Sequence, residues 1–280
     1  MEQLINYFNN IPSAHRAGII IGGIVLFWII EGIIPLAQLQ YSKWKHAGLN
    51  LFFTATTIVV NFLFASGIYF TSVWAQENQF GLLNMVTLPT WLYLIVGMLV
   101  LDLVGAYTIH WLEHRVKLMW RFHLVHHTDT YVDTTTANRH HPGESVFRAV
   151  FTLLGVFLLG APMWLVMLYQ SCSAFLSQFN HADIRLPEWL DKAISIAIVS
   201  PNMHKVHHHY VLPYTDSNFG NIFSIWDRMF GTFMYIEPEK IVYGIDTHMK
   251  PEENNEMGNL LKVPFQTYRA PVGAKYSEGE

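Results

Sequence analysis

Long apolar runs separated by short polar stretches occupy most of the first 180 residues of this 280-residue chain. Residues 17–37, 49–74 and 90–111 are each long enough to cross the roughly 30 Å hydrocarbon core of a bilayer as one helix. The fourth run, residues 147–179, is too long for one crossing, and a Gly-Ala-Pro break at 160–162 predicts a hairpin that enters the membrane and returns. We therefore predict an all-α membrane protein with about four transmembrane helices, the last region being bent or a hairpin.

Tryptophans and basic residues between the runs predict how the helices sit in the membrane. An aromatic belt is indicated at the ends of the runs by Trp44, Trp74, Trp91 and Trp111. Segment 38–48 contains two Lys or Arg residues, segment 75–89 none and segment 112–147 four. The positive-inside rule places the first and third segments in the cytoplasm, and the hairpin returns the last hundred residues to that side.

Composition and the chain ends narrow the class of protein. Only 14% of the residues are charged and the net charge is −4, which excludes a basic surface for nucleic acid. The N-terminus lacks the basic region and cleavage site of a signal peptide, so we expect the first run to be retained. The C-terminal AKYSEGE carries no retrieval signal, which favours a bacterial inner membrane over the endoplasmic reticulum. The single cysteine, Cys172, excludes an internal disulfide and a CxxC motif, and we expect a packed thiol.

Most of the histidines gather in three short groups: HWLEH at 110–114, HLVHH at 123–127 and HKVHH at 204–208. The first has i, i+4 spacing and the other two share i, i+3, i+4 spacing, so on a helix each group presents its imidazoles from one face. Neutral imidazole is a good ligand for iron, zinc and copper. The predicted topology brings all three groups to one side of the membrane. We therefore predict one assembled metal site, with the ligands His110, His114, His123, His126, His127, His204, His207 and His208.

Eight clustered imidazoles exceed the needs of one metal ion, since a tetrahedral site takes four ligands. Two metal ions that share these nitrogens fit the number better. The carboxylate-bridged sites of four-helix bundles use Glu-x-x-His pairs, which this chain lacks. The site is therefore predicted to be rich in histidine and poor in carboxylate.

HxxxH followed by two HxxHH motifs among membrane helices resembles the fatty acid hydroxylase superfamily, and in detail its sterol desaturase branch. Residues 200–233, SPNMHKVHHHYVLPYTDSNFGNIFSIWDRMFGTF, are similar to the family's histidine run with Asn-aromatic-Gly, Trp-Asp and Phe-Gly-Thr after it. RHHPGE at 139–144 and NHADIRLPEWL at 180–190 resemble two further family elements. The likeness covers residues 95–235. It departs at Asp183, where the branch often has asparagine, and at Phe219, where many relatives have tyrosine.

The resemblance implies a non-haem diiron enzyme that uses O2 and two electrons to hydroxylate or desaturate a lipid C–H bond. It implies two iron ions, with O2 as co-substrate, and zinc is expected to replace iron on overexpression. The chain has no separate stretch long enough for a cytochrome b5 domain, so an external ferredoxin- or cytochrome b5-like donor is expected. The expected domains are N-terminal transmembrane helices at 1–94, a catalytic domain at 95–235 and a C-terminal tail at 236–280.

Other polar residues are candidates for positions in or beside the predicted site. His181 is predicted to be a ligand, and His141 either a ligand or a donor to one. Three carboxylates are candidate acceptors for the outer N–H of a ligating imidazole, or otherwise helix caps or arginine partners: Asp102, Glu144 and Asp227. Two further histidines are adjacent in sequence to predicted ligands and are expected to point away from the faces that carry them: His140 and His209. Ordinary surface positions are expected for His15, His46 and His248.

A divalent-metal transporter is the alternative function. Transporters place their ligands near the bilayer midplane on broken helices. Here the histidine groups follow the ends of the apolar runs, and the repeated HxxHH spacing is too regular for a metal-buffering loop. The sequence therefore favours the enzyme over the transporter.

Overall fold

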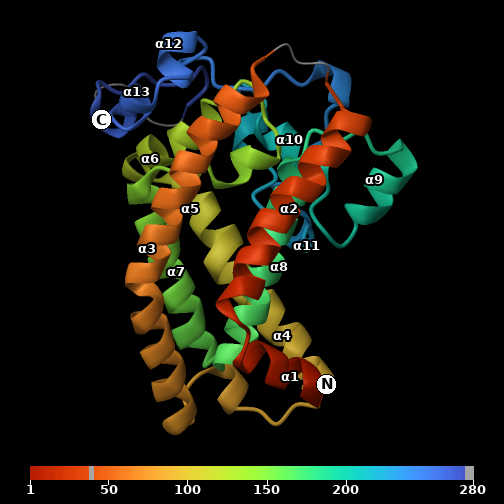
Figure 1. Ribbon diagram of the computed structural model, residues 1–280, viewed down its shortest axis with the longest axis vertical. Coiled ribbons are helices and arrows are strands. Elements are labelled where there is room, and N and C mark those ends of the chain that lie inside the picture. Colours follow the sequence, from red (N-terminus) through yellow and green to blue (C-terminus); the bar gives the residue numbers. More distant parts are fainter. Residues whose placement is uncertain (38–40, 275–280) are drawn as a thin grey trace.

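A computed structural model describes residues 1–37 and 41–274, and the regular elements of that part are helices (Figure 1). The α-helices are α1 Glu2–Asn9, α2 Ser13–Ile33, α3 Lys43–Glu77, α4 Thr90–Asp102, α5 Ile109–Arg115, α6 Lys117–His127, α7 Pro142–Leu159, α8 Met163–His181, α9 Glu188–Ile194, α10 Pro201–His207, α11 Ile225–Met229, α12 Pro251–Asn254 and α13 Met257–Leu260. Short 3-10 turns and isolated β-bridges join them. The predicted all-α class is confirmed.

Four stretches of the described chain are long and apolar enough to cross a membrane: Ser13–Ile33, Lys43–Asn84, Thr90–Arg115 and Pro142–Leu159. Their number confirms the predicted spans. The 35 residues of α3 are about 52 Å long at 1.5 Å per residue. This helix therefore extends well beyond the hydrocarbon core and supports the polar end of the molecule.

The fourth apolar region breaks where its sequence predicts. Gly160 ends α7 in a left-handed conformation with φ of 66°, and the carbonyl of Phe80 lies where a Cβ atom would be. Pro162 then precedes α8. The two halves diverge after this turn, because α7 packs chiefly on α3 while α8 packs chiefly on α2 and α1. The predicted hairpin is thus opened, with α4 in contact with both halves.

The third span contains a π-helical turn at Leu103–Thr108, between α4 and α5. A π turn closes hydrogen bonds from i to i+5 and so adds a residue to one turn of the helix. Positions before and after it no longer share the faces that regular α-helical spacing would give them. Asp102 precedes this turn and His110 follows it, so the turn decides how the first histidine group is aimed.

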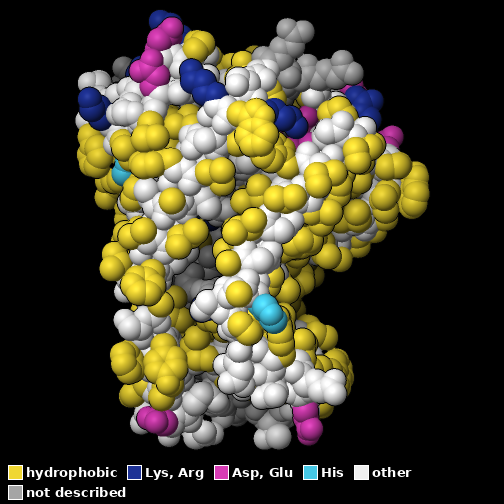
Figure 2. Space-filling view, in the orientation of Figure 1, with side chains coloured by type: hydrophobic (Ala, Val, Ile, Leu, Met, Phe, Trp, Pro, Cys, Tyr) yellow, Lys and Arg dark blue, Asp and Glu magenta, His cyan; other side chains and the backbone are white. Residues whose placement is uncertain are grey.

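The polar helix ends and the chain after α8 form a cap at one end of the bundle, and α1 lies at the other end (Figure 1). Hydrophobic side chains cover the flanks of the bundle, while Lys and Arg gather at the cap end (Figure 2). Within the cap, the C-terminal segment packs against the ends of two helices, since Ile245 and Leu260 join a core with Phe53 of α3 and Leu124 of α6. The cap thereby fixes the ends of the helices that carry histidines.

Candidate metal centre

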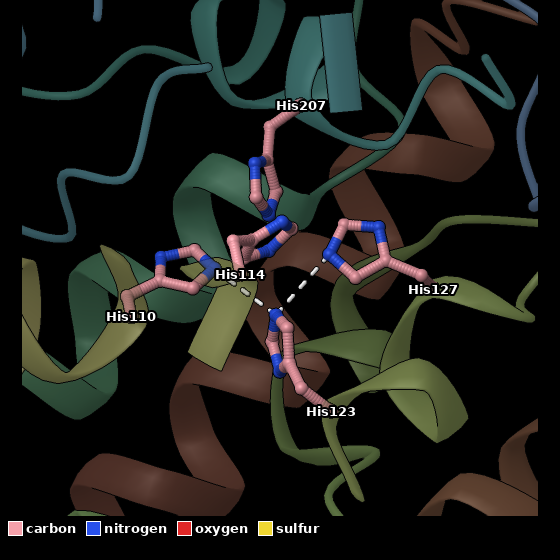
Figure 3. Close-up of side chains that lie close together, drawn as sticks. All are labelled: His110, His114, His123, His127 and His207. Atoms are coloured by element: carbon pink, nitrogen blue, oxygen red, sulfur yellow. Dashed lines mark hydrogen bonds between the residues drawn. The ribbon is translucent and has the colours of Figure 1, made fainter. Parts of the chain in front are cut away.

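The nine predicted histidine ligands are all buried and lie in two adjoining groups. The first group is shown in Figure 3 and consists of His110, His114, His123, His127 and His207. The second group consists of His126, His181, His204 and His208. Within each group the nearest ligand nitrogens all lie within 4.8 Å of one another. The structure therefore assembles the three sequence motifs, together with His181, into two sets of converging imidazoles.

Each HxxHH motif supplies both groups, and the two motifs do so in opposite senses. On α6, His123 and His127 point into the first group while His126 points into the second. At α10 the assignment is reversed. His204 and His208, which are four residues apart, belong to the second group, and His207 belongs to the first. Each HxxHH motif thus contributes histidines from one helix to both groups.

Distances between nitrogens fit ligands around metal ions. In the first group His123 Nε2 is 3.2 Å from His110 Nε2 and 3.1 Å from His127 Nε2. In the second, His181 Nε2 is 3.2 Å from His126 Nε2 and 3.1 Å from His204 Nε2. Adjacent nitrogens bound at about 2.1 Å to one ion would be separated by about 3.0 Å in octahedral and about 3.4 Å in tetrahedral geometry. The observed spacings lie between these limits.

Unpartnered buried nitrogens give an independent sign of bound metal. The Nε2 atoms of His114 and His207 are buried and have no hydrogen-bond partner among the described residues. Leaving a buried polar atom unsatisfied costs about 1–3 kcal/mol, so several such atoms in one cluster require an explanation. A metal ion that accepts these lone pairs provides one, and the donor set therefore fits two ions.

Outer hydrogen bonds fix how several rings present their metal-facing nitrogen. The Nδ1 atoms of His110 and His207 lie 2.8 and 2.7 Å from backbone carbonyls, and His123 Nδ1 lies 2.8 Å from Glu144 Oε1. A proton on Nδ1 leaves the lone pair on Nε2, and such partners also raise ligand basicity. Burial lowers the pKa of His207 well below its ordinary value, so its imidazole is neutral and able to bind metal at neutral pH.

Carboxylates gather behind His123 of the first group. Glu144 accepts from His123 and from Arg148 Nε, the latter at 3.0 Å. Arg148 also donates to Glu113, which is fully buried and was missed by the sequence reasoning although it lies inside the HWLEH motif. Glu144 thus lies beside a predicted ligand, His123, and also contacts Arg148, which are two of the roles considered for it. The sequence did not single out Glu113, because a glutamate on a helix is ordinarily read as a solvent-exposed residue.

Asp102 makes its hydrogen bonds away from the histidines. It accepts from the backbone N–H groups of residues 222 and 223 at 3.3 and 3.2 Å, and from Trp226 Nε1 at 3.0 Å. The π-helical turn supplies the reason, because it separates the face of Asp102 from that of His110. The residue therefore anchors the segment that follows the third histidine group.

Asp227 anchors the same segment from its other side. It accepts from the backbone N–H groups of Phe219 and Gly220 at 2.7 and 2.9 Å. The carbonyl of Phe219 in turn is the partner of His110 Nδ1. The ring of Phe219 lies 5.1–5.7 Å from three first-group imidazoles. Asp227 thus acts on a ligand through one intermediate backbone group, and Phe219 forms an apolar wall of the site.

The remaining histidines lie outside both groups. His141 caps α7, since its Nδ1 accepts from Gly143 N at 3.0 Å, and its other nitrogen is 3.3 Å from a carbonyl. His140 rests against the ring of His126 at 5.0 Å between centroids. His209 Nδ1 accepts from Val242 N at 3.1 Å. Of the two roles considered for His141, the geometry shows neither.

A buried polar network behind α6 holds the loop that follows it. His46 of α3 contacts Asp129 and Asp133 at 2.9 and 3.1 Å, and buried Arg139 donates to the carbonyl of residue 125. The surface position expected for His46 is therefore wrong, as it is for His248, which is 4% exposed. Tertiary partners far away in sequence create these environments, and local composition does not reveal them. His15 is exposed, as expected.

Comparisons with known proteins agree with this geometry. Residues 94–232 match the family model described as "Fatty acid hydroxylase". Ornithine lipid hydroxylase OlsE of Rhizobium tropici is 26% identical over 145 residues, which are 52% of this chain and 43% of that protein. Alkylglycerol monooxygenase of Danio rerio is 30% identical over 52% of this chain and 31% of its own length. Methylsterol monooxygenase 1-3 of Arabidopsis thaliana is 22% identical over 75% of this chain and 76% of its own length.

The matched region spans less than half of the first two relatives. No solved structure matches the chain. The predicted resemblance is confirmed by the family match and by the named relatives, which include a sterol monooxygenase. The region of this chain that carries the histidine groups, residues 94–232, is therefore similar to the fatty acid hydroxylase family.

Proposed function

We propose that this protein is a membrane-bound, non-haem diiron oxygenase that hydroxylates a C–H bond of a lipid. The reaction balances as R–H, O2, two electrons and two protons giving R–OH and water. The observation that carries the proposal is the division of nine buried histidines into two groups with converging nitrogens. One metal ion would use only part of this set, and a structural zinc site would need four ligands.

The metal ions would supply the redox chemistry that activates O2, and the chain holds and shields them. Five imidazoles would hold one ion and four the other. Glu144 and the carbonyl of Phe219 hold the outer protons of His123 and His110. Phe219 is fully buried against the first group, and there it excludes water.

The position of the centre supports a lipid substrate taken from the bilayer. His110 lies within the third span, near its cap end, so the site is at the boundary between the hydrocarbon core and the cap. The relatives are named for oxidation of an ornithine lipid, an alkylglycerol and a methylsterol. We propose an apolar lipid whose oxidised carbon lies close to its polar end. Desaturation is the other outcome that the same centre would support.

The electrons come from a separate ferredoxin- or cytochrome b5-like donor in this proposal. Lys and Arg gather at the cap end (Figure 2), which by the positive-inside rule supports a cytoplasmic position for the cap and the metal centre. A donor on that side would reach the cap without crossing the bilayer. The bacterial source of one relative supports a bacterial inner membrane.

The test combines metal content with product analysis. Protein reconstituted with iron(II) should bind two ions per chain, and lipids of cells that express it should gain one oxygen atom by mass spectrometry. Cells that express His207→Ala at equal level serve as the control and should show no gain. One ion or none in active protein would refute the diiron centre. Metal uptake into vesicles with unchanged lipids would support the transporter instead.

A further inference from the structure

Helices α9 and α11, with the residues just after each, expose a set of large apolar side chains at the edge of the cap. The exposed fractions are 71% for Trp189, 70% for Ile196, 42% for Ile225, 63% for Met229 and 56% for Phe230. We call these five residues the α9/α11 face. Large exposed apolar patches mark binding sites for a protein or a membrane. In Figure 2 hydrophobic side chains continue from the flank of the bundle onto the edge of the cap that carries α9.

The two parts of the face form one structural unit. The segment after α9 pairs with the segment before α11 through backbone hydrogen bonds, from Val199 N to Ile222 O at 3.0 Å and from Ser224 N to Ala197 O at 3.2 Å. Arg228 of α11 adds a hydrogen bond of 2.8 Å to the carbonyl of residue 195. The helices therefore present their exposed side chains from a common support.

The depth of α11 follows from its contacts with the third span. Trp91 and Trp111 lie near the two ends of Thr90–Arg115. They are 20 residues apart, and a helix of that length spans about 30 Å, the thickness of the hydrocarbon core. The middle of that interval is residue 101. Leu99 and Leu103, on either side of it, pack in one cluster with Trp226 of α11. The start of α11 thus lies beside the middle of the span.

The end of α11 lies closer to the cap but still between the two tryptophans. The ring of Phe230 stacks on that of Tyr107 at 5.3 Å between centroids, and Tyr107 lies four residues, about 6 Å, inside Trp111. Trp226 is further tied to the span by its hydrogen bond to Asp102. A segment held at these positions is surrounded on its open side by whatever surrounds the span, which in a bilayer is lipid.

We propose that α11 and Phe230 are embedded in the cap-side leaflet and that α9 lies at its headgroup level, so the α9/α11 face binds lipid of the same bilayer. Charged groups fit this placement. Arg228 reaches back to the carbonyl of residue 195 and over Phe233, and Lys192 of α9 is exposed. Both have long aliphatic stems that let the charge reach the headgroups while the stem contacts apolar surface. This inference needs neither bound metal nor catalytic activity.

Embedding would couple the bilayer to the metal centre. Asp227 lies on α11 between the exposed Ile225 and Met229, and it holds the backbone N–H of Phe219. The carbonyl of Phe219 is the partner of His110 Nδ1. The membrane-facing helix is therefore two hydrogen bonds away from a ligand of the first group.

Spin-label accessibility tests the placement in the full-length protein. Cys172 is the only cysteine, so Cys172→Ala gives a background for single labels at Met229→Cys and Ile196→Cys. Phe62→Cys, on the exposed side of α3, and Val272→Cys, in the C-terminal segment, are matched references because both residues are 77% exposed. Each variant is placed in lipid nanodiscs with one protein per disc, and collision rates with O2 and with a water-soluble nickel complex are measured.

The expected ratio of O2 to nickel accessibility at residue 229 is several-fold above that at residue 272 and close to that at residue 62. Residue 196 should give a value between the two references. A ratio at residue 229 closer to that of residue 272 would overturn the proposal and assign the face to a soluble partner. If Met229→Cys fails to fold, Ile225→Cys probes the same helix and is judged by the same criterion.

Discussion

Replacing Glu144 by glutamine should weaken the metal site of the first group selectively. Glu144 is fully buried, and its Oε1 lies 2.8 Å from His123 Nδ1. Glutamine keeps the size of the side chain and can still accept from that N–H, so only the negative charge is lost. Arg148 retains Glu113 as its partner, and therefore the substitution does not leave an isolated buried cation.

The size of the effect follows from the type of hydrogen bond that changes. A bond to a charged partner contributes about 1.5–3 kcal/mol and a neutral one about 0.5–1.5 kcal/mol. The loss is therefore about 1–1.5 kcal/mol, which corresponds to roughly tenfold in the dissociation constant. This is the lower end of the roughly 10–100-fold range seen when a partner of a metal-bound histidine is changed. Glu144→Ala, which removes the acceptor altogether, should approach the upper end.

Chelator titration of the loaded protein measures this effect. The chain offers a matched control in Glu188→Gln, because Glu188, like Glu144, has a basic partner four residues later, but it is exposed on α9. Release of one of the two ions should shift by about tenfold in chelator concentration in Glu144→Gln and stay unchanged in Glu188→Gln. An equal shift for both ions, or no shift at all, would refute the assignment of Glu144 to one group.

Three further predictions follow from the geometry. His207→Ala should abolish lipid oxidation, whereas His209→Ala should keep activity within about 10–100-fold of the unmodified protein, as product analysis at matched protein level will show. Burial lowers the pKa of His248 to about 4, so the unfolded chain binds that proton more readily and stability falls as the pH drops below about 6.5. At pH 5 the charge-linked loss of unfolding free energy should be about 2 kcal/mol in the unmodified protein and absent in His248→Gln. Thermal unfolding of both proteins at pH 7.5 and pH 5 measures the difference. A reporter after residue 130 should read as cytoplasmic, and one near residue 80 as external; the reverse would place the cap outside.

Periodic and compositional signals predicted the parts of the fold that depend on local sequence. The bilayer sets the length of the spans, so apolar run length was sufficient to find them, and the Gly-Ala-Pro break marked the end of α7. Helical spacing likewise predicted which histidines share a face. These features need no knowledge of which helix packs on which.

The parts that escaped prediction depend on tertiary contacts. The π-helical turn re-aims Asp102, and nothing in LVGAYT distinguishes it from regular helix. The division of each HxxHH motif between two groups depends on how α6 and α10 cross, which spacing alone does not determine. His46 and His248 are both buried although they lie in polar or weakly apolar stretches. The partners of His46, Asp129 and Asp133, are more than 80 residues away in sequence.

The two histidine groups are unequal in their surroundings, and this inequality bears on how the proposed centre would work. The first group has five imidazoles and is backed by two buried carboxylates with one arginine between them, Glu113, Glu144 and Arg148. The second has four imidazoles, and the outer nitrogen of His181 has only neutral partners, a backbone carbonyl and an amide oxygen. Negative charge behind a ligand raises its basicity, so the first group should hold its ion more tightly. The second group would therefore hold its ion with fewer and less basic ligands. We therefore expect the second ion to leave first during chelation, and Glu144→Gln to bring the two release steps closer together.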